Sequence, residues 1–300
     1  MNDIYTKQNK EYILMLQYSQ RKHYDMAENI QYLIWIFMII NIIINNHVVV
    51  NNFLGTNIVK IISFVLTVSY IFLRLQINKN IEIGAYTKEV IDCTLFDCDI
   101  KKNLKKFTEV QLNEFAVRKK NKNKNEYLCQ INNTGKDEPR GVKNWYEDRQ
   151  QMDINSAVYG CQKENIWWDE RLSKIYMGLF AFISLVIIVA MLIVNRNESI
   201  KFLIFTVVIP STQIVIEVVT QGVQLIKLII YRAKVEMKCK GIEKNINNIR
   251  KEDLEELQEL ILQRRLYKFL IPNKLHSILS RKFHEFREAM IQVNFIKKCE

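Results

Sequence analysis

Residues 33–44 read LIWIFMIINIII, a run of large apolar side chains broken by one asparagine. The run is the centre of an apolar block at residues 30–50, which has the length of about 20 residues that an α-helix needs to cross the hydrocarbon core of a bilayer. Three more apolar blocks follow, at about residues 57–77, 176–194 and 202–230. We therefore expect four transmembrane helices, arranged as two hairpins with short connections.

The composition of the 300-residue chain supports a helical membrane protein. Only 8 Gly and 3 Pro are present, which argues against a turn-rich β architecture. A soluble bundle is the alternative, because buried core helices can be apolar on all sides. Four such helices of span length would, however, need a larger soluble protein to cover them. The fold class that we predict is an all-α integral membrane protein with a mainly helical cytoplasmic domain.

The positions of lysine and arginine predict which side of the membrane each connection occupies, because cytoplasmic connections carry an excess of these residues. Residues 45–56 contain neither, and the connection between the third and fourth blocks contains only Arg196 and Lys201. Residues 78–174 and the tail after residue 227 are rich in both. We therefore expect the amino terminus, the middle and the carboxyl terminus of the chain to be cytoplasmic.

This topology divides the chain into five segments. In chain order we expect a cytoplasmic amino-terminal helix (1–29), a first transmembrane hairpin (30–77), a cytoplasmic sensing domain (78–175), a second transmembrane hairpin (176–230) and cytoplasmic carboxyl-terminal helices (231–300). The first segment is polar, and no small-residue cleavage site follows the first apolar block. We therefore expect no cleavable signal peptide.

The cytoplasmic segments are predicted to be mostly helical, with interruptions. Residues 78–120 read as helix broken at residues 90–97, where β-branched side chains allow a short strand. The charged run RKKNKNKNE at residues 118–126 has no apolar period, and is either a solvated loop or a contact for anionic lipid or nucleotide. Residues 134–141 are turn material. Apolar spacing in the tail predicts two amphipathic helices, one on each side of Pro272.

A segment rich in aromatic side chains precedes the third apolar block. Its aromatic rings offer flat faces on which a base can stack, and its basic side chains offer charge for phosphates. The alternative for its tryptophans is packing, or anchoring at the membrane interface. The candidate ligand-binding residues are Arg140, Lys143, Asn144, Trp145, Tyr146, Gln162, Lys163, Asn165 and Trp168.

The fourth apolar block carries a polar stripe. Its polar residues recur at spacings of three and four, together with Pro210, which places them on one face of a helix. A carboxylate in the membrane must face protein or water, because exposure to lipid costs several kcal/mol. Two interpretations are open: the stripe holds the helix bundle together, or it lines a water-filled pore. The candidate pore-lining residues are Thr206, Gln213, Glu217, Thr220, Gln221 and Gln224.

The chain carries no residue pattern typical of an enzyme or a metal site. The four histidines are His23, His47, His276 and His284, and none lies beside a candidate nucleophile or in HExxH spacing. The six cysteines form no C-x-x-C pair, so we expect reduced thiols rather than zinc ligands. We therefore expect no catalytic residues, no metal and no cofactor.

Several short motifs follow one another in a recognisable order. They are Ile4-x-x-x-Gln8-Asn9, Gln20-Arg21-Lys22-x-Tyr24, Asp92-Cys93-Thr94-Leu95-Phe96, Asn144-Trp145-Tyr146-x-Asp148, Cys161-Gln162-x-x-Asn165-x-x-Trp168-Asp169, Leu257-Gln258 and Gln263-Arg264-Arg265 before Pro272. In this order the chain resembles, over nearly its whole length, the SMODS-associated four-transmembrane effector family, which are pore-forming proteins of bacterial CBASS-type anti-phage systems. In one departure from the family pattern, Asp97-Cys98-Asp99 stands where an apolar residue, proline and tryptophan are expected.

The resemblance implies a function. A neighbouring nucleotidyltransferase makes a cyclic oligonucleotide on infection, and the effector senses it in the cytoplasm, assembles as a homo-oligomer and permeabilises the bacterial inner membrane. The implied partners are the lipid bilayer, other copies of the chain and the cyclic oligonucleotide, with no DNA. The alternative is a non-conducting membrane receptor or scaffold that recruits a cytoplasmic partner.

Overall fold

The computed structural model describes residues 2–46, 55–194, 212–273, 275 and 278–279. Most of both hairpin connections, with Arg196 and Lys201, and two further expected features lie wholly or partly outside these residues. The first is the beginning of the fourth apolar block, with Thr206 and Pro210. The second is most of the amphipathic helix that we expect after Pro272.

The described chain is helical, with one isolated bridge between Thr134 and Lys143. Its helices are α1 (Ile4–Lys7), α2 (Glu11–Asn46), α4 (Thr56–Phe96), α5 (Ile100–Asn103), α6 (Glu109–Lys122), α7 (Lys124–Asn132), α8 (Ile154–Val194), α10 (Thr212–Glu243) and α11 (Lys251–Arg265). Across these residues the expectation of an all-α fold is confirmed.

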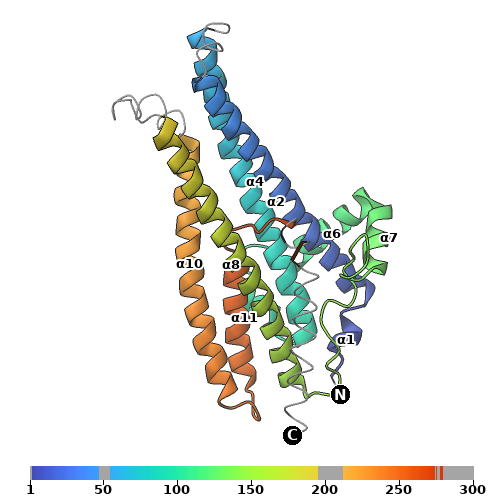
Figure 1. Cartoon of the computed structure of the whole chain (residues 1–300). Helices are drawn as coiled ribbons and strands as arrows, with labels where there is room; N and C mark the ends of the chain where they lie inside the picture. The colour runs from blue at the N-terminus through green and yellow to red at the C-terminus, as the bar shows by residue number, and fades with distance from the viewer. Residues whose placement is uncertain (1, 47–54, 195–211, 274, 276–277, 280–300) are drawn as a thin grey trace.

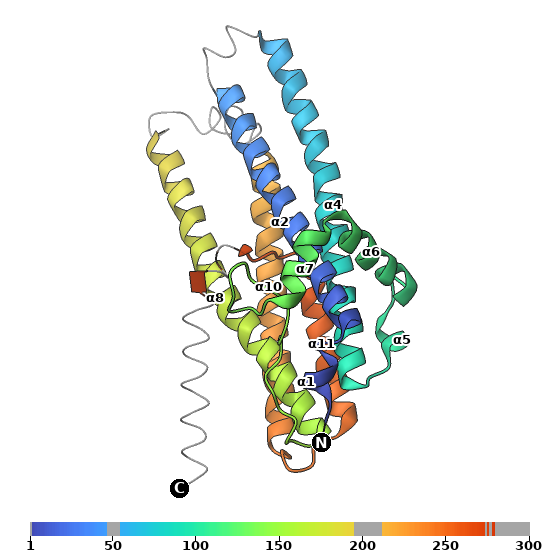
Figure 2. The same ribbon diagram turned by 90° about the vertical axis from the view of Figure 1, so that its right-hand side faces the viewer.

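Four long helices form two pairs that meet at one end of the molecule and separate at the other (Figure 1). Helix α2 lies along α4, and α11 packs against both α8 and α10. Helices α6 and α7 lie beside the first part of α2, as Figure 2 shows from the side. The main apolar core occupies the end where the pairs meet, and combines residues of α2, α4, α8, α10 and α11. We call this part the cytoplasmic body, after the side of the membrane on which we expect it to lie.

The predicted segment boundaries at residues 29/30, 77/78, 175/176 and 230/231 fall inside continuous helices. Helix α4, for example, runs from Thr56 to Phe96 with no break. Each long helix therefore links the cytoplasmic body directly to an apolar segment. Moving one end of such a helix moves the other, because its backbone hydrogen bonds run without interruption.

The break and strand that we expected at residues 90–97 are wrong, because these residues form the last turns of α4. Val90, Ile91 and Leu95 are buried in the core at helical spacing, so tertiary packing outweighs their β propensity. The helix ends at Phe96, and the next residue, Asp97, has a φ of 56°, in the left-handed region. The departure from the family pattern therefore coincides with the end of this helix.

The loop that we considered for residues 118–126 is also incorrect, because the run is helical apart from Asn123, although most of its side chains are exposed. Helix α6 begins with a capping box between Thr108 and Gln111 and ends at Lys122. The Asn123 side chain then accepts a hydrogen bond from the Glu126 amide and starts α7. The turn at residues 134–141 and the first tail helix, α11, are confirmed.

At the end where the helix pairs separate, many large apolar side chains are exposed. Among the described residues, one helix, Asn57–Phe96, is long and apolar enough to cross a membrane, and 11% of its most apolar stretch is buried. Exposed apolar side chains also occur on the other three long helices. Examples are Ile36, Ile39 and Ile43 of α2, Ile61, Phe64 and Phe72 of α4, Phe182 and Ile193 of α8, and Ile216, Val219 and Val223 of α10.

Candidate functional site

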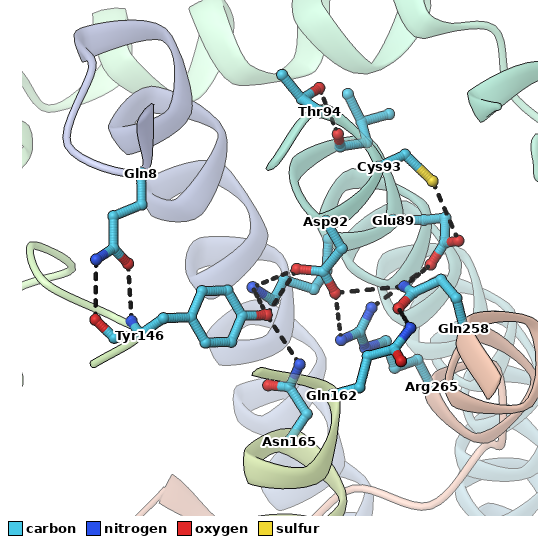
Figure 3. A network of polar contacts seen from close by, with 12 residues as sticks. Gln8, Glu89, Asp92, Cys93, Thr94, Tyr146, Gln162, Asn165, Gln258 and Arg265 are labelled. Carbon is cyan, nitrogen blue, oxygen red and sulfur yellow. Dashed lines mark hydrogen bonds and ion pairs between the residues drawn. The ribbon is translucent and has the colours of Figure 1, made fainter. Parts of the chain in front are cut away.

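A network of charged and polar side chains lies inside the cytoplasmic body (Figure 3). Asp92 of α4 is its centre and is completely buried. One carboxylate oxygen lies 2.9 Å from Lys88 Nζ and accepts a 2.8 Å hydrogen bond from the Tyr146 hydroxyl. The other accepts a 2.7 Å bond from the Arg265 guanidinium. Burial opposes ionisation, but the charges of Lys88 and Arg265 hold the pKa of Asp92 below its usual value.

A second buried carboxylate, Glu89, joins Asp92 to helix α11. It accepts 2.8 Å hydrogen bonds from Gln258 of α11 and from Asn103, and Arg265 Nη1 lies 3.6 Å away. Burial raises the pKa of Glu89. Burial alone would lower the pKa of Arg265, but the neighbouring carboxylates Asp92 and Glu89 raise it. Arg265 is therefore held as a cation, and its removal would leave buried carboxylates uncompensated.

Tyr146 connects the network to the loop before α8. Its hydroxyl accepts hydrogen bonds from Asn165 of α8 at 2.8 Å and from Lys88 at 3.2 Å. The Lys88 ammonium lies 4.8 Å from the centre of the Tyr146 ring and 5.3 Å from that of Trp145. Burial lowers the pKa of Lys88. We define Lys88, Glu89, Asp92, Tyr146, Asn165, Gln258 and Arg265 as the polar network.

The amino-terminal segment is tied to the polar network through the Tyr146 backbone. The Gln8 side-chain amide donates to the Tyr146 carbonyl at 2.9 Å and accepts from its N–H at 2.7 Å. Asn9 makes the same kind of double contact with Asn144, donating to its side chain at 2.8 Å and accepting from its N–H at 3.1 Å. Two adjacent residues therefore hold the loop by four hydrogen bonds.

Helices α8 and α11 are joined by three further contacts. The Gln162 side chain donates to the Leu254 carbonyl at 2.9 Å and to Gln258 at 3.2 Å. Arg264 lies 2.7 Å from Asp169 in an ion pair. Six of the sequence motifs, spread from Gln8 to Arg265, therefore contribute residues to contacts within one part of the cytoplasmic body.

The structure separates the residues that we predicted to bind a ligand. Tyr146, Gln162 and Asn165 belong to the buried contacts above, and Trp145 lies at their edge with 45% of its surface exposed. Asn144 and Lys143 lie on the outer surface of the same loop. The other three lie elsewhere: the Arg140 carbonyl accepts from Arg21, Lys163 pairs with Glu243, and Trp168 contacts Trp167. Their role in binding stays a prediction.

Sequence reasoning missed Lys88 and Glu89, which carry half of the buried charge of the polar network. They precede every motif that drew attention in that region. The available signal was their spacing, because Lys88 lies one helical turn before Asp92, as in many helical ion pairs. Our expectation of a broken helix hid this signal. Within the described ranges no three His, Cys, Asp or Glu side chains gather as metal ligands, and the absence of metal and cofactor stays a prediction.

A family model, the SMODS-associating 4TM effector domain, matches residues 2–293. The chain belongs to this family. It is therefore an effector of nucleotide-signalling anti-phage systems that is associated with the membrane, as the motif order predicted. Comparison with curated proteins and with solved structures gave no match.

In this SMODS-associating 4TM effector, the polar stripe of the fourth apolar block faces the other helix pair. Glu217 of α10 is buried and accepts hydrogen bonds from Gln31 of α2 at 3.4 Å and from Tyr70 of α4 at 3.3 Å. Arg74 of α4 lies 3.5 Å from the same carboxylate and donates to Gln31 at 2.8 Å. Gln221, also buried, donates to Glu217 at 2.9 Å.

The other stripe residues of this effector are placed less fully. Gln224 is buried and Thr220 is half-buried, whereas Thr206 and the side chain of Gln213 lie outside the described residues. In the single chain, Glu217 thus connects helices, which is the first of the two interpretations of the stripe. Its role in a pore stays a prediction.

Proposed function

We propose that the chain spans the membrane with four helices and, on binding a cyclic oligonucleotide, assembles into a homo-oligomer that permeabilises the bacterial inner membrane. The observation that carries the proposal is the set of large apolar side chains exposed on α2, α4, α8 and α10. They belong to the ends of these helices that separate in Figure 1. Soluble monomers rarely expose large contiguous apolar patches, whereas a helix that spans a membrane presents apolar side chains to the lipid. Membership of a family of membrane-associated nucleotide-signalling effectors supports the signal and the location.

The polar network offers a route from signal to membrane. It joins α4, α8 and α11, and α4 and α8 continue without a break into the apolar segments. A ligand shifts the equilibrium between a closed and an open arrangement only by its differential affinity for the two. A ligand that displaces the Tyr146 loop would bind the two arrangements differently, because Tyr146 contacts both α4 and α8.

The test is a leak assay on the full-length chain reconstituted into vesicles that contain a self-quenched dye. We expect cyclic oligonucleotides from a panel to release the dye, and the matching linear mononucleotides to release none. As a matched control, vesicles without protein receive the same nucleotides. We propose no catalytic step, so mass spectrometry should recover the added nucleotide and the lipids unchanged.

The outcomes separate the proposal from its alternative. Nucleotide binding without dye release would contradict permeabilisation and favour a non-conducting receptor or scaffold. Dye release that does not depend on nucleotide would contradict the sensing half. A hydrolysed nucleotide or an altered lipid would overturn the proposal that the chain is not an enzyme.

A further inference from the structure

A basic groove lies on the surface of the cytoplasmic body, beside the Tyr146 loop. It has a volume of about 510 Å³ and is bounded by the start of α2, by the α6–α7 junction and by Lys143. Small-molecule sites in proteins are typically clefts of about 300–1,000 Å³. The groove is therefore of ligand size, and neither the polar network nor the membrane segments account for it.

The groove carries more positive charge than its acidic residues neutralise. Of its lysines, Lys120 pairs with Glu11 at 2.9 Å. Lys124 and Lys143 are exposed and have no ion pair with any residue that the structure describes. Two lysines from different elements thus project positive charge at one concave surface, which attracts an anion.

Other lining residues fit an organic ligand rather than a bare ion. Tyr127 is 2% exposed, and its hydroxyl has no hydrogen-bond partner among the described residues. The hydroxyl is itself covered, so a ligand reaches it only by moving the side chains around it. Because a buried hydroxyl without a partner is costly, a ligand atom that bonds it is favoured. The amide of Asn132 and the exposed side chain of Leu128 complete a wall on which polar and flat groups can lie.

The groove is also connected to the polar network by direct contacts. Asn9 lines the groove and holds Asn144 by two hydrogen bonds. The adjacent residue, Gln8, holds the Tyr146 backbone, and the Tyr146 hydroxyl reaches Asp92. A ligand that moves Asn9 or Lys143 therefore acts on the loop that carries Tyr146.

We propose that this groove binds the phosphates of the nucleotide signal through Lys124 and Lys143, with Tyr127 as a neutral hydrogen-bonding group; this rests on the proposed function. A lipid headgroup offers the same phosphate chemistry. The groove residue Leu14, however, lies about 24 Å along α2 from Ile30, where the apolar block begins. This distance favours a soluble nucleotide.

The test measures binding to the purified full-length chain in detergent micelles. The probes are pyrophosphate, cyclic dinucleotides of adenine and guanine, and vesicles of phosphatidylglycerol. Lys124→Ala/Lys143→Ala is compared with Lys105→Ala/Lys234→Ala, which removes two exposed lysines outside the groove. We expect the groove variant to lose at least about tenfold in nucleotide affinity, and the control variant to bind as the parent does.

Each outcome distinguishes a nucleotide site in the groove from a site elsewhere, a lipid site or an anion site. Equal affinity in the groove and control variants overturns the proposal, as does a loss confined to the lipid vesicles. If the groove variant binds nucleotide with unchanged affinity and still releases dye in response, the groove is not the nucleotide site. The proposed function is then still supported. If the groove binds pyrophosphate but no cyclic dinucleotide, the nucleotide is not its ligand. The groove is then an anion site only.

Discussion

Tyr146 shows how much can depend on one hydroxyl group. It donates to Asp92, accepts from Asn165 and lies within 3.2 Å of Lys88, so it contacts α4 and α8 at the same time. The backbone of the same residue is held by Gln8. Tyr146 is thus the place where the loop, the amino terminus and two long helices meet (Figure 3).

We predict that Tyr146→Phe lowers the free energy of unfolding by about 1–3 kcal/mol, because it leaves Asn165 and one oxygen of Asp92 short of a buried hydrogen bond. The ring and its contacts with Phe96 are kept. Thermal unfolding in detergent measures the effect. Tyr12→Phe is the control, since the Tyr12 hydroxyl is hydrogen-bonded but exposed; an equal loss in both variants would contradict the prediction.

Several residue-level features could be predicted from the sequence, but their contacts could not. The motifs pointed to Gln8, Asp92, Tyr146, Asn165 and Arg265 as residues of interest. No sequence spacing states that Gln8 holds the Tyr146 backbone or that Arg265 approaches the Asp92 carboxylate, because each contact joins parts of the chain more than a hundred residues apart. Asp92, for example, lay in a segment that we expected to leave the helix.

At the scale of single elements, the continuity of α4 carries a mechanical prediction. Lys79 lies between the apolar half of α4 and the polar network, and its side chain is exposed. Proline inside a helix removes a hydrogen bond and costs about 3 kcal/mol or more. We predict that Lys79→Pro keeps nucleotide binding but loses nucleotide-triggered dye release, whereas Lys79→Ala keeps both.

Binding by the proline variant serves as the check that the cytoplasmic body has folded. Dye release at the parental level from Lys79→Pro would mean that α4 does not transmit the signal.

The continuity of this helix could not be predicted from the sequence. The β-branched residues 90–97 predicted an interruption, and only their burial against other helices explains why the helix continues.

At the scale of the whole molecule, Glu217 joins two helix pairs that otherwise diverge (Figure 1). Interhelical hydrogen bonds in membranes contribute about 1 kcal/mol each. We predict that Glu217→Gln weakens the contact with Arg74 and raises dye release in the absence of nucleotide by about fivefold, which is the effect of 1 kcal/mol on a closed–open equilibrium.

The charge-swapped pair Arg74→Glu/Glu217→Arg separates the two interpretations of the stripe. If Glu217 acts by joining helices, the swap restores low basal release, because the ion pair is re-formed with opposite polarity. If Glu217 lines a pore, the swap reverses the local charge and changes ion selectivity instead.

The stripe and its helical face were predictable from spacing. The partners Gln31, Tyr70 and Arg74 were not, since they belong to another hairpin.

The contacts between the two ends of the chain also have a consequence for its biosynthesis. Glu28 accepts hydrogen bonds from the Asn273 amide, and Asp92 is neutralised in part by Arg265. A ribosome adding roughly 5–20 residues per second needs roughly 10–50 s to travel from residue 28 to residue 273. Both apolar hairpins emerge in that interval, before the cytoplasmic body can close. Chains that stop before residue 265 lack both of these contacts, and we expect them to lack an assembled cytoplasmic body.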